Sequence, residues 1–252
     1  MILTDLHVHS VFCDGKNTPE EIVLSAIDKG LKTIGILAHS FVENDPEGTL
    51  SPEKTQEFIS CVTALKDKYK DKINVLLGIE ADYFSNIDLT PYDYVIGSVH
   101  YLSANGKIYL LDYSKDIFVD VVNKVFNGDY YSAAENYYEN VSNVVEKTGA
   151  DIIAHIDLIT KFNENDNLFS TDNPRYINAY KKAIDKLVTY GKPFEINTGV
   201  IGRGHRSSPY PAKPVYDYIK SQGGKFILSS DAHSKEGITF EFSKWAKEFD
   251  LL

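Results

Sequence analysis

Short apolar runs alternate along the chain with longer amphipathic segments. Each run is five to eight residues long and is rich in Ile, Val, Leu and Phe, a pattern typical of strands buried on both faces. We therefore expect seven strands, at ILTDLH (2–7), TIGILAH (33–39), INVLLGIE (73–80), YVIGSVH (94–100), DIIAH (151–155), PFEIN (193–197) and KFILSSD (225–231).

The segments between the runs contain the start signals of helices. Thr18-Pro19-Glu20-Glu21 forms a capping box with Pro at the first helical position, and Gly30 ends this helix. Ser51-Pro52-Glu53 begins a second helix over 51–71. Further helices are expected at 115–127, 130–148, 173–190, 212–222 and 239–249, whereas 81–93 forms only a short connection.

Strands that alternate with helices predict parallel βα units. Seven strands on this plan favour a closed or nearly closed barrel, and an open doubly wound sheet is the alternative. No Gly-x-Gly-x-x-Gly follows the first run, which weighs against a dinucleotide-binding sheet. No repeat or composition shift divides the 252 residues, so we expect a single domain over 1–252.

Composition narrows the possible partners and surroundings. The 26 basic and 36 acidic residues give a net charge of −10, without the basic excess of a nucleic-acid-binding protein. No run approaches the roughly 18 apolar residues of a membrane span, and the first residues lack the features of a signal peptide. Cys13 and Cys61 form no disulfide framework, so we expect a reducing, cytoplasmic setting. Nothing in the sequence indicates the oligomeric state.

Metal-binding side chains stand where the predicted strands end. Six of the seven histidines lie at or just beyond these ends, which form the functional face of parallel barrels. His7 and His9 are two apart, so they point to the same side of a strand. The runs end at His7, His39, Glu80, His100, His155, Asn197 and Asp231, and His9 and His233 lie just beyond two of these ends.

A single His at a strand end is usually a hydrogen-bonded structural residue, but so many imidazoles and carboxylates together are costly to bury without a cation. Nitrogen and oxygen donors without an obligatory thiolate suit Zn, Mn or Fe. A lone catalytic zinc needs three protein ligands and a water. We therefore expect two or three clustered divalent ions, with Glu80 as a bridging carboxylate.

Seven segments, in order, carry a resemblance to a known family. These are DLHVHSVFCDG (5–15), AHS (38–40), GIEADY (78–83), IGSVHYL (96–102), AHIDLITKF (154–162), EINT (195–198) and SSDAHS (229–234). Together they resemble the polymerase and histidinol phosphatase (PHP) superfamily and, within it, the histidinol-phosphate phosphatases. The resemblance implies a distorted seven-stranded (β/α)7 TIM-like barrel with a trinuclear metal site.

The family pattern implies three sets of metal ligands. Members carry either His or Asp in the loop that here contains Asp14, and the neighbouring Cys13 is either a stray ligand or a spectator thiol. The three sets are His7, His9, Glu80 and Asp231; Glu80, His100 and His155; and Asp14, His39 and His233.

Basic residues in two loops are candidates for binding phosphate. The resemblance implies a role for Lys161 and for an arginine after "NT", but Gly199 occupies that position, so Arg203 or Arg206 takes the role. Arginine makes bidentate contacts to phosphate, and the alternative is a solvated loop. His205 is either a proton donor or phosphate ligand, or a loop histidine bonded to backbone.

The resemblance implies hydrolysis of L-histidinol phosphate to L-histidinol and phosphate in histidine biosynthesis, by attack of a metal-bridging hydroxide. An acid protonates the leaving alcohol, and the candidates are Asp231, His233 and His205. The cationic part of the substrate is expected to meet side chains at the mouth of the site: Asp82, Tyr83, Tyr101 and Asp157.

Two other functions remain open at this point. A phosphoesterase of the same superfamily could act on a nucleotide, a sugar phosphate or phosphotyrosine with the same ligands. A non-catalytic metal-binding barrel, like the degenerate PHP domains of some polymerases, is the other alternative.

Overall fold

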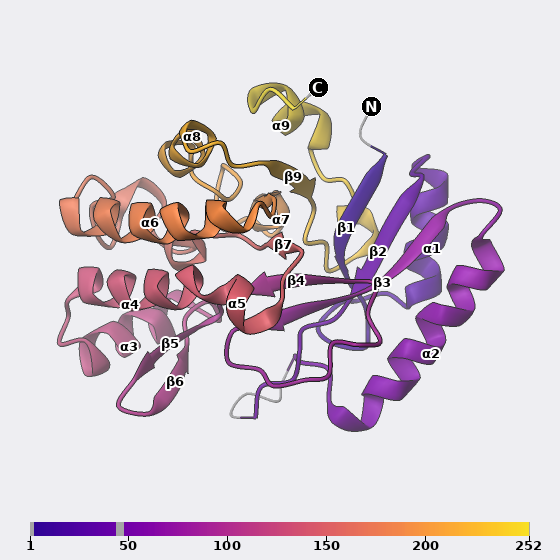
Figure 1. The fold of residues 1–252 in the computed structure, drawn as a ribbon, viewed down its shortest axis with the longest axis horizontal. Coiled ribbons are helices and arrows are strands. Elements are labelled where there is room, and N and C mark those ends of the chain that lie inside the picture. The colour runs from indigo at the N-terminus through magenta and orange to yellow at the C-terminus, as the bar shows by residue number, and fades with distance from the viewer. Residues whose placement is uncertain (1–2, 44–47, 252) are drawn as a thin grey trace.

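Seven parallel strands form the main sheet of the computed structural model, which describes residues 3–43 and 48–251 (Figure 1). Neighbouring strands pair in parallel throughout, and the connections between them contain helices except at 83–93. In sheet order they are β1 (Thr4–His9), β2 (Thr33–Leu37), β3 (Asn74–Asp82), β4 (Tyr94–Ser98), β7 (Ile152–Ile153), β8 (Phe194–Asn197) and β9 (Phe226–Ser229).

The last strand returns to the first, so the sheet is nearly closed. Val8 of β1 forms a parallel bridge with Ala232, which lies just beyond β9. The backbone N–H of His9 donates to the carbonyl of Ala232 at 2.8 Å, and the N–H of Ala232 donates to the carbonyl of His7 at 3.1 Å. The predicted barrel is therefore confirmed, and the open doubly wound sheet is wrong.

The helices begin close to the predicted positions. Thr18 accepts a hydrogen bond from the N–H of Glu21 at 3.3 Å, and Glu21 accepts one from the N–H of Thr18 at 2.9 Å, which confirms the capping box. The helices are α1 (Pro19–Asp28), α2 (Pro52–Tyr69), α3 (Lys115–Val125), α4 (Tyr130–Ser142), α5 (Val144–Thr148), α6 (Pro174–Leu187), α7 (Gly199–Gly202), α8 (Lys213–Ser221) and α9 (Phe242–Glu248).

Several segments differ from the prediction, among them α7, which lies where no helix was expected. A hairpin of β5 (Tyr101–Ala104) and β6 (Lys107–Leu110) follows β4, and Asn105 and Gly106 turn it with positive φ angles of 53° and 73°. Asn-Gly between short apolar runs is a strong hairpin signal, although no strand was predicted in this segment. The helix predicted over 130–148 divides at Asn143, whose φ of −105° and ψ of 0° are not helical.

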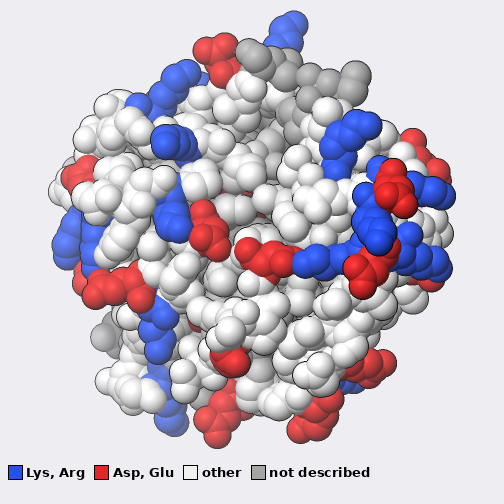
Figure 2. Space-filling view, turned by 45° about the vertical axis from the view of Figure 1, so that its right-hand side comes forward, with Lys and Arg blue, Asp and Glu red and all other residues white. Residues whose placement is uncertain are grey.

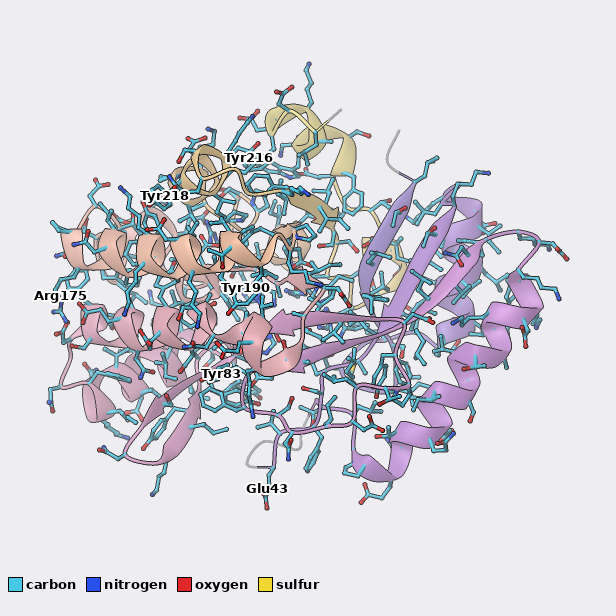
Figure 3. All side chains as sticks on the ribbon, in the orientation of Figure 1. Glu43, Tyr83, Arg175, Tyr190, Tyr216 and Tyr218 are labelled. Atoms are coloured by element: carbon cyan, nitrogen blue, oxygen red, sulfur yellow. The ribbon has the colours of Figure 1, made fainter. Side chains whose placement is uncertain are left out.

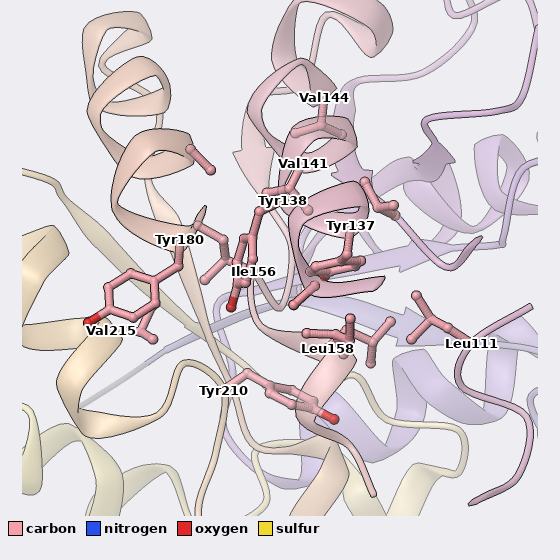
Figure 4. Packing of buried hydrophobic residues seen from close by; sticks show 14 of the residues in the cluster. Leu111, Tyr137, Tyr138, Val141, Val144, Ile156, Leu158, Tyr180, Tyr210 and Val215 are labelled. Carbon is pink, nitrogen blue, oxygen red and sulfur yellow. The ribbon is translucent and has the colours of Figure 1, made fainter. Parts of the chain in front are cut away.

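Tyrosines fill the contact between α4 and α6. Tyr137 and Tyr138 of α4 (Figure 4) are only 1% exposed. The hydroxyls of Tyr138 and Tyr176 are hydrogen-bonded at 3.1 Å. At the outer edge, Arg175 of α6 forms an ion pair with Asp129 at 2.8 Å beside the start of α4 (Figure 3). The aromatic spacing over 130–145 is therefore a packing feature, as the sequence predicts.

The surface mixes both signs of charge. On the face in Figure 2, Lys and Arg side chains lie among Asp and Glu side chains and do not gather into one basic patch. Within residues 3–43 and 48–251, no helix combines the length and apolar character needed to cross a membrane.

The inside of the barrel is filled at one level by Tyr94. Its hydroxyl donates to the carbonyl of Leu6 at 2.5 Å, across the barrel from β4 to β1. The ring lies directly against Gly35 and Gly78, where a Cβ atom would overlap its carbon and oxygen atoms. These two glycines are needed for space, because protein interiors are close-packed.

Gly78→Ala is expected to lower the free energy of unfolding by about 1–3 kcal/mol, the usual effect of overpacking a core. Gly202→Ala is the matched control, because a Cβ there would lie 3.7 Å from the nearest side chain. Urea denaturation followed by tryptophan fluorescence measures both. Equal stabilities of the two variants would show that Tyr94 does not depend on the space at Gly78.

Candidate metal centre

All nine predicted ligands meet at the carboxyl ends of the strands. Parallel strands end at one edge of a barrel, so residues far apart in the sequence converge there. Strand β1 extends past its predicted end and carries His7 and His9, both fully buried. The others are Glu80 within β3, and His39, His100, His155, Asp231, His233 and Asp14 in the segments that follow strands.

The carboxylate of Glu80 lies between two sets of imidazoles. Its Oε2 atom is 2.9 Å from Nδ1 of His39 and 3.2 Å from Nε2 of His7. Its Oε1 atom is 3.0 Å from Nε2 of His155 and 3.4 Å from Nε2 of His100. One carboxylate with donors on both oxygens has the arrangement of a bridging ligand, as the sequence predicts for Glu80.

Two aspartates, Asp231 and Asp14, also contact the clustered histidines. Asp231 Oδ1 lies 3.3 Å from Nε2 of His9, and Asp14 Oδ2 lies 3.0 Å from Nε2 of His233. Asp14 reaches the site because the loop after β1 folds back on itself at Gly15, where a Cβ would overlap the backbone of His9. The loop aspartate therefore lies beside the histidines with which the family pattern groups it.

The donor chemistry fits clustered cations. Nε2 of His7 and Nε2 of His9 are 3.1 Å apart and both buried, a contact that a shared cation would stabilise. Among the described residues, three sets of donor atoms lie within 4.8 Å of one another: His9, Asp14, His39 and His233; His7, His9 and Glu80; and His39, Glu80 and His100. These sets overlap more than the family-based sets, since His9 and His39 each belong to two of them.

The pKa values of two of the donors are shifted toward the forms that bind cations. Burial alone would raise the pKa of Glu80, but His39, His7 and His100 hold this pKa well below its usual range. Burial, with the neighbouring His233 and His39, lowers the pKa of His9 to about 3. Glu80 is therefore ionised and His9 is neutral at physiological pH, the forms in which each binds a metal.

Cys13 lies beside the cluster, with its Sγ atom 3.4 Å from Nδ1 of His9. Burial raises the pKa of this thiol to about 11. Because the thiolate is the form that binds metals, this environment favours the spectator role for Cys13.

Arg203 is the loop arginine that reaches the cluster. Gly199 begins α7 so close to β9 that a Cβ would lie 2.7 Å from the carbonyl oxygen of Ser230. The turn of α7 then brings Arg203 Nη2 to 3.0 Å from Asp231 Oδ2, and Nη1 to 2.9 Å from Nδ1 of His233. Because Gly199 has no side chain, α7 can start close to β9, and Arg203 then lies beside the predicted ligands.

Asp112 holds the side chain of Lys161. Its ammonium donates to the backbone carbonyl of Asp112 at 2.6 Å and to the Asp112 carboxylate at 3.2 Å. Lys161, Asp112, Tyr101 and Tyr113 all line a cavity of about 390 Å³ that also contacts Asp14, His39, Glu80 and His100. The predicted substrate residues Lys161 and Tyr101 therefore share one cavity with predicted metal ligands.

Arg206 and His205 do not contact the predicted metal ligands in the way that Arg203 does. Arg206 donates to the hydroxyl of Thr160 at 2.7 Å, stacks over the ring of Tyr210 and lines a second cavity, of about 260 Å³. His205 is exposed and packs edge-on against Phe162 at 5.9 Å. Burial, with Lys161 and Arg203 nearby, lowers the pKa of His205. Of the two arginines, only Arg203 contacts predicted metal ligands.

Of the side chains expected at the mouth, Asp157 is engaged elsewhere, and Tyr83 contacts a neighbouring ring. Asp157 is fully buried, and its Oδ2 atom accepts from the N–H of Ala212 at 2.8 Å. Tyr83 packs edge-on against the ring of Phe84 at 4.9 Å. The prediction that Asp157 meets a substrate is wrong, because no surface of it is accessible.

Two buried carboxylates behind the imidazoles have roles that the sequence did not predict. Glu195 Oε1 lies 2.5 Å from Nδ1 of His7, and Asp82 Oδ2 lies 3.1 Å from Nδ1 of His100. Asp82, which was expected to meet the substrate, lines the same cavity as Lys161 and also contacts His100. A Glu in the middle of the apolar run PFEIN is the signal that could have identified Glu195, since a buried strand rarely contains an unpaired carboxylate.

Comparisons with known proteins place this geometry in a family. The sequence model of the PHP domain matches residues 5–199. The "probable histidinol-phosphatase" of Deinococcus radiodurans is 28% identical over 260 residues, covering 98% of this chain and 92% of that protein. The histidinol-phosphatase of Lactococcus lactis subsp. lactis is 28% identical over 241 residues, covering 91% and 83%.

Two solved structures share the fold. A Listeria monocytogenes protein provisionally assigned as a histidinol phosphatase matches with a TM-score of 0.82 at 20% identity, covering 96% of this chain and 99% of that one. The histidinol phosphate phosphatase of Lactococcus lactis, crystallised with zinc, L-histidinol and phosphate, matches with a TM-score of 0.68 at 22% identity, covering 98% and 92%. With the family model matching most of its length, the chain belongs to the PHP domain family.

Proposed function

We propose that this chain is a metal-dependent phosphomonoesterase that hydrolyses L-histidinol phosphate to L-histidinol and phosphate in histidine biosynthesis. The observation that carries the proposal is the Glu80 carboxylate between two sets of imidazoles, beside a cavity that contains Lys161. The names of the relatives from Deinococcus radiodurans and Lactococcus lactis support this substrate, as does the crystallised complex of the Lactococcus lactis enzyme. The chain retains every expected type of ligand, which argues against a non-catalytic barrel.

The nine clustered donors would hold two or three divalent ions, of Zn, Mn or Fe. When bound, such ions polarise a phosphoryl oxygen and lower the pKa of a water molecule, which supplies a nucleophile near neutral pH. The protein's part is to hold the donors at fixed positions around Glu80. Their burial keeps bulk water from competing for the donors and strengthens their attraction to cations.

Two cations of the protein itself would hold the substrate phosphate. Arg203 has two guanidinium nitrogens at the cluster, within 3.0 Å of Asp231 and His233. Lys161 is fixed by Asp112. Both charges are in place before substrate binds, so they can meet the charge that develops on phosphorus without reorganising. The aromatic rings of Tyr101 and Tyr113 in the same cavity offer faces to a cationic imidazole or amine.

The leaving alcohol needs a proton, and electrostatics separates the three candidates. Burial alone would raise the pKa of Asp231, but Arg203 and His7 hold this pKa well below its usual range. Asp231 is therefore ionised at neutral pH and has no proton to give. His233 and His205 remain as the candidate acids. The lowered pKa of His205 disfavours its protonated form at neutral pH, so His205 is the weaker of the two.

The direct test of the function is kcat/KM for a panel of phosphate monoesters, with Mn or Zn present. The panel contains L-histidinol phosphate, a nucleotide, a sugar phosphate and phosphotyrosine. L-histidinol phosphate is expected to be preferred by about 10–100-fold, the discrimination that a shaped pocket gives, and a chelator is expected to abolish activity. A stronger preference for another ester, or activity that survives chelation, would refute the proposal.

Glu80→Ala is expected to lower kcat about a thousandfold or more, because one change removes a donor from both sets of imidazoles and metal ions contribute several kcal/mol to catalysis. Glu20→Ala is the control, since the Glu20 side chain is 44% exposed and its partners among the described residues are Lys68 and Tyr69. Steady-state kinetics measures both variants. A Glu80→Ala enzyme with normal kcat would contradict the bridging role.

Arg203→Ala and Arg206→Ala are expected to act differently. The first removes a charge at the cluster and should raise KM at least tenfold, since a charge-assisted hydrogen bond contributes about 1.5–3 kcal/mol. The second should leave KM nearly unchanged but lower the unfolding free energy by roughly 3 kcal/mol, because it leaves the buried Asp157 without its cation at 3.9 Å. Steady-state kinetics and urea denaturation distinguish these effects, and a raised KM only in Arg206→Ala would reverse the assignment.

A further inference from the structure

A fully buried carboxylate, that of Glu195 in β8, lies behind the cluster and contacts it from the barrel interior. Oε1 lies 2.5 Å from Nδ1 of His7 and also accepts from the hydroxyl of Ser229. Oε2 accepts from the backbone N–H of His155 at 3.1 Å and from the side-chain amide of Asn197 at 2.8 Å. Both oxygens are thus fully used, each by two groups.

The partners of Glu195 Oε2 require an acceptor. The N–H of His155 can only donate, and Asn197 must present its NH₂ group because its oxygen accepts from the N–H of Gly199 at 3.0 Å. Only Ser229 and His7 could reverse their roles. An ionised carboxylate accepts and never donates, so it keeps a proton on Nδ1 of His7. That proton leaves the opposite nitrogen, Nε2, as the one with a free lone pair.

Nε2 of His7 is the nitrogen that faces the site. It lies 3.2 Å from Glu80 Oε2 and 3.1 Å from Nε2 of His9. A carboxylate behind a ligating histidine fixes its tautomer and ring orientation and increases its basicity. Asn197 extends the connection, because its amide also donates to Asp231 Oδ2 at 3.2 Å.

We propose that Glu195 is a positioning residue of the metal centre: it fixes the tautomer of His7 with the proton on Nδ1, so that Nε2 is available to a cation. Through His155 and Asn197 the same carboxylate connects predicted ligands that lie in β1, after β7 and after β9. This inference rests on the metal binding in the proposed function, and it goes further in assigning a role to a residue that is not itself a ligand.

Glu195→Gln is the most direct variant, since it keeps the shape and removes the charge. The new NH₂ group must face two donors. If the NH₂ group faces His155 and Asn197, it opposes the fixed backbone N–H of His155, and two donors meet. If it faces His7, Nδ1 of His7 must accept, and the proton moves to Nε2. Either arrangement weakens metal binding, and loss of such a partner typically lowers affinity by about 10–100-fold.

Ser229→Ala is the matched control, because it removes a donor from the same oxygen but leaves the bond to His7. Metal-free wild type, Glu195→Gln and Ser229→Ala are titrated with Zn²⁺ in competition with a chromophoric chelator. We expect more than one equivalent bound by wild type, a weakening of about 10–100-fold in Glu195→Gln, and near wild-type affinity in Ser229→Ala. Equal affinities of wild type and Glu195→Gln would overturn the proposal while leaving the metal-dependent function intact, whereas no zinc binding by wild type would refute both.

A second measurement decides the matter if Glu195→Gln does not fold. In ¹⁵N NMR of the zinc-loaded wild-type protein, we expect Nδ1 of His7 to carry a proton and Nε2 to have none. A purely structural role for Glu195 makes no prediction about this tautomer, and a proton on Nε2 of His7 would overturn the proposal without any variant.

Discussion

The shared carboxylate of Glu80 is the interaction on which the rest of this site depends. Five imidazoles, those of His7, His9, His39, His100 and His155, lie within 3.4 Å of its two oxygens, and they come from segments that follow or form four strands. A buried anion surrounded by lone pairs is unfavourable unless positive charge is supplied. Protonated imidazoles supply it without metal, and cations supply it with metal. The fold holds this arrangement together by ending its parallel strands at one rim.

Barrel closure determines which side chains meet. The bridge between Val8 and Ala232 brings the segment after β9 beside β1, and with it Asp231 to His9. Close backbone approach at Gly199 then directs Arg203 toward the same ligands. The anion, its imidazoles and the nearest guanidinium are therefore consequences of one closed sheet, and a shift in strand register would separate them together.

Much of this could be predicted from the sequence, because both main signals are local. Apolar runs of strand length show where the strands lie, and the residue at the end of each run shows what stands at the rim. This reasoning identified Glu80 and the histidines of the cluster without any spatial information. The family pattern supplied Asp14, whose loop has no periodicity to interpret.

What could not be predicted depends on pairing between distant segments. His7 and Glu195 are 188 residues apart, and only closure of the barrel makes them partners. The choice between Arg203 and Arg206 depended on the turn of α7, which an irregular glycine-rich loop does not reveal. Asp157 was misplaced for a similar reason, since a residue two positions after a ligand can point either to the rim or into the packing behind it.

Anomalous diffraction from crystals grown with Mn²⁺ tests the central claim most directly, because it locates the ions without relying on activity. We predict separate manganese peaks on the two sides of the Glu80 carboxylate, each within ligand distance of one of its oxygens. A single peak away from Glu80, or a rim with no peak at all, would contradict the account.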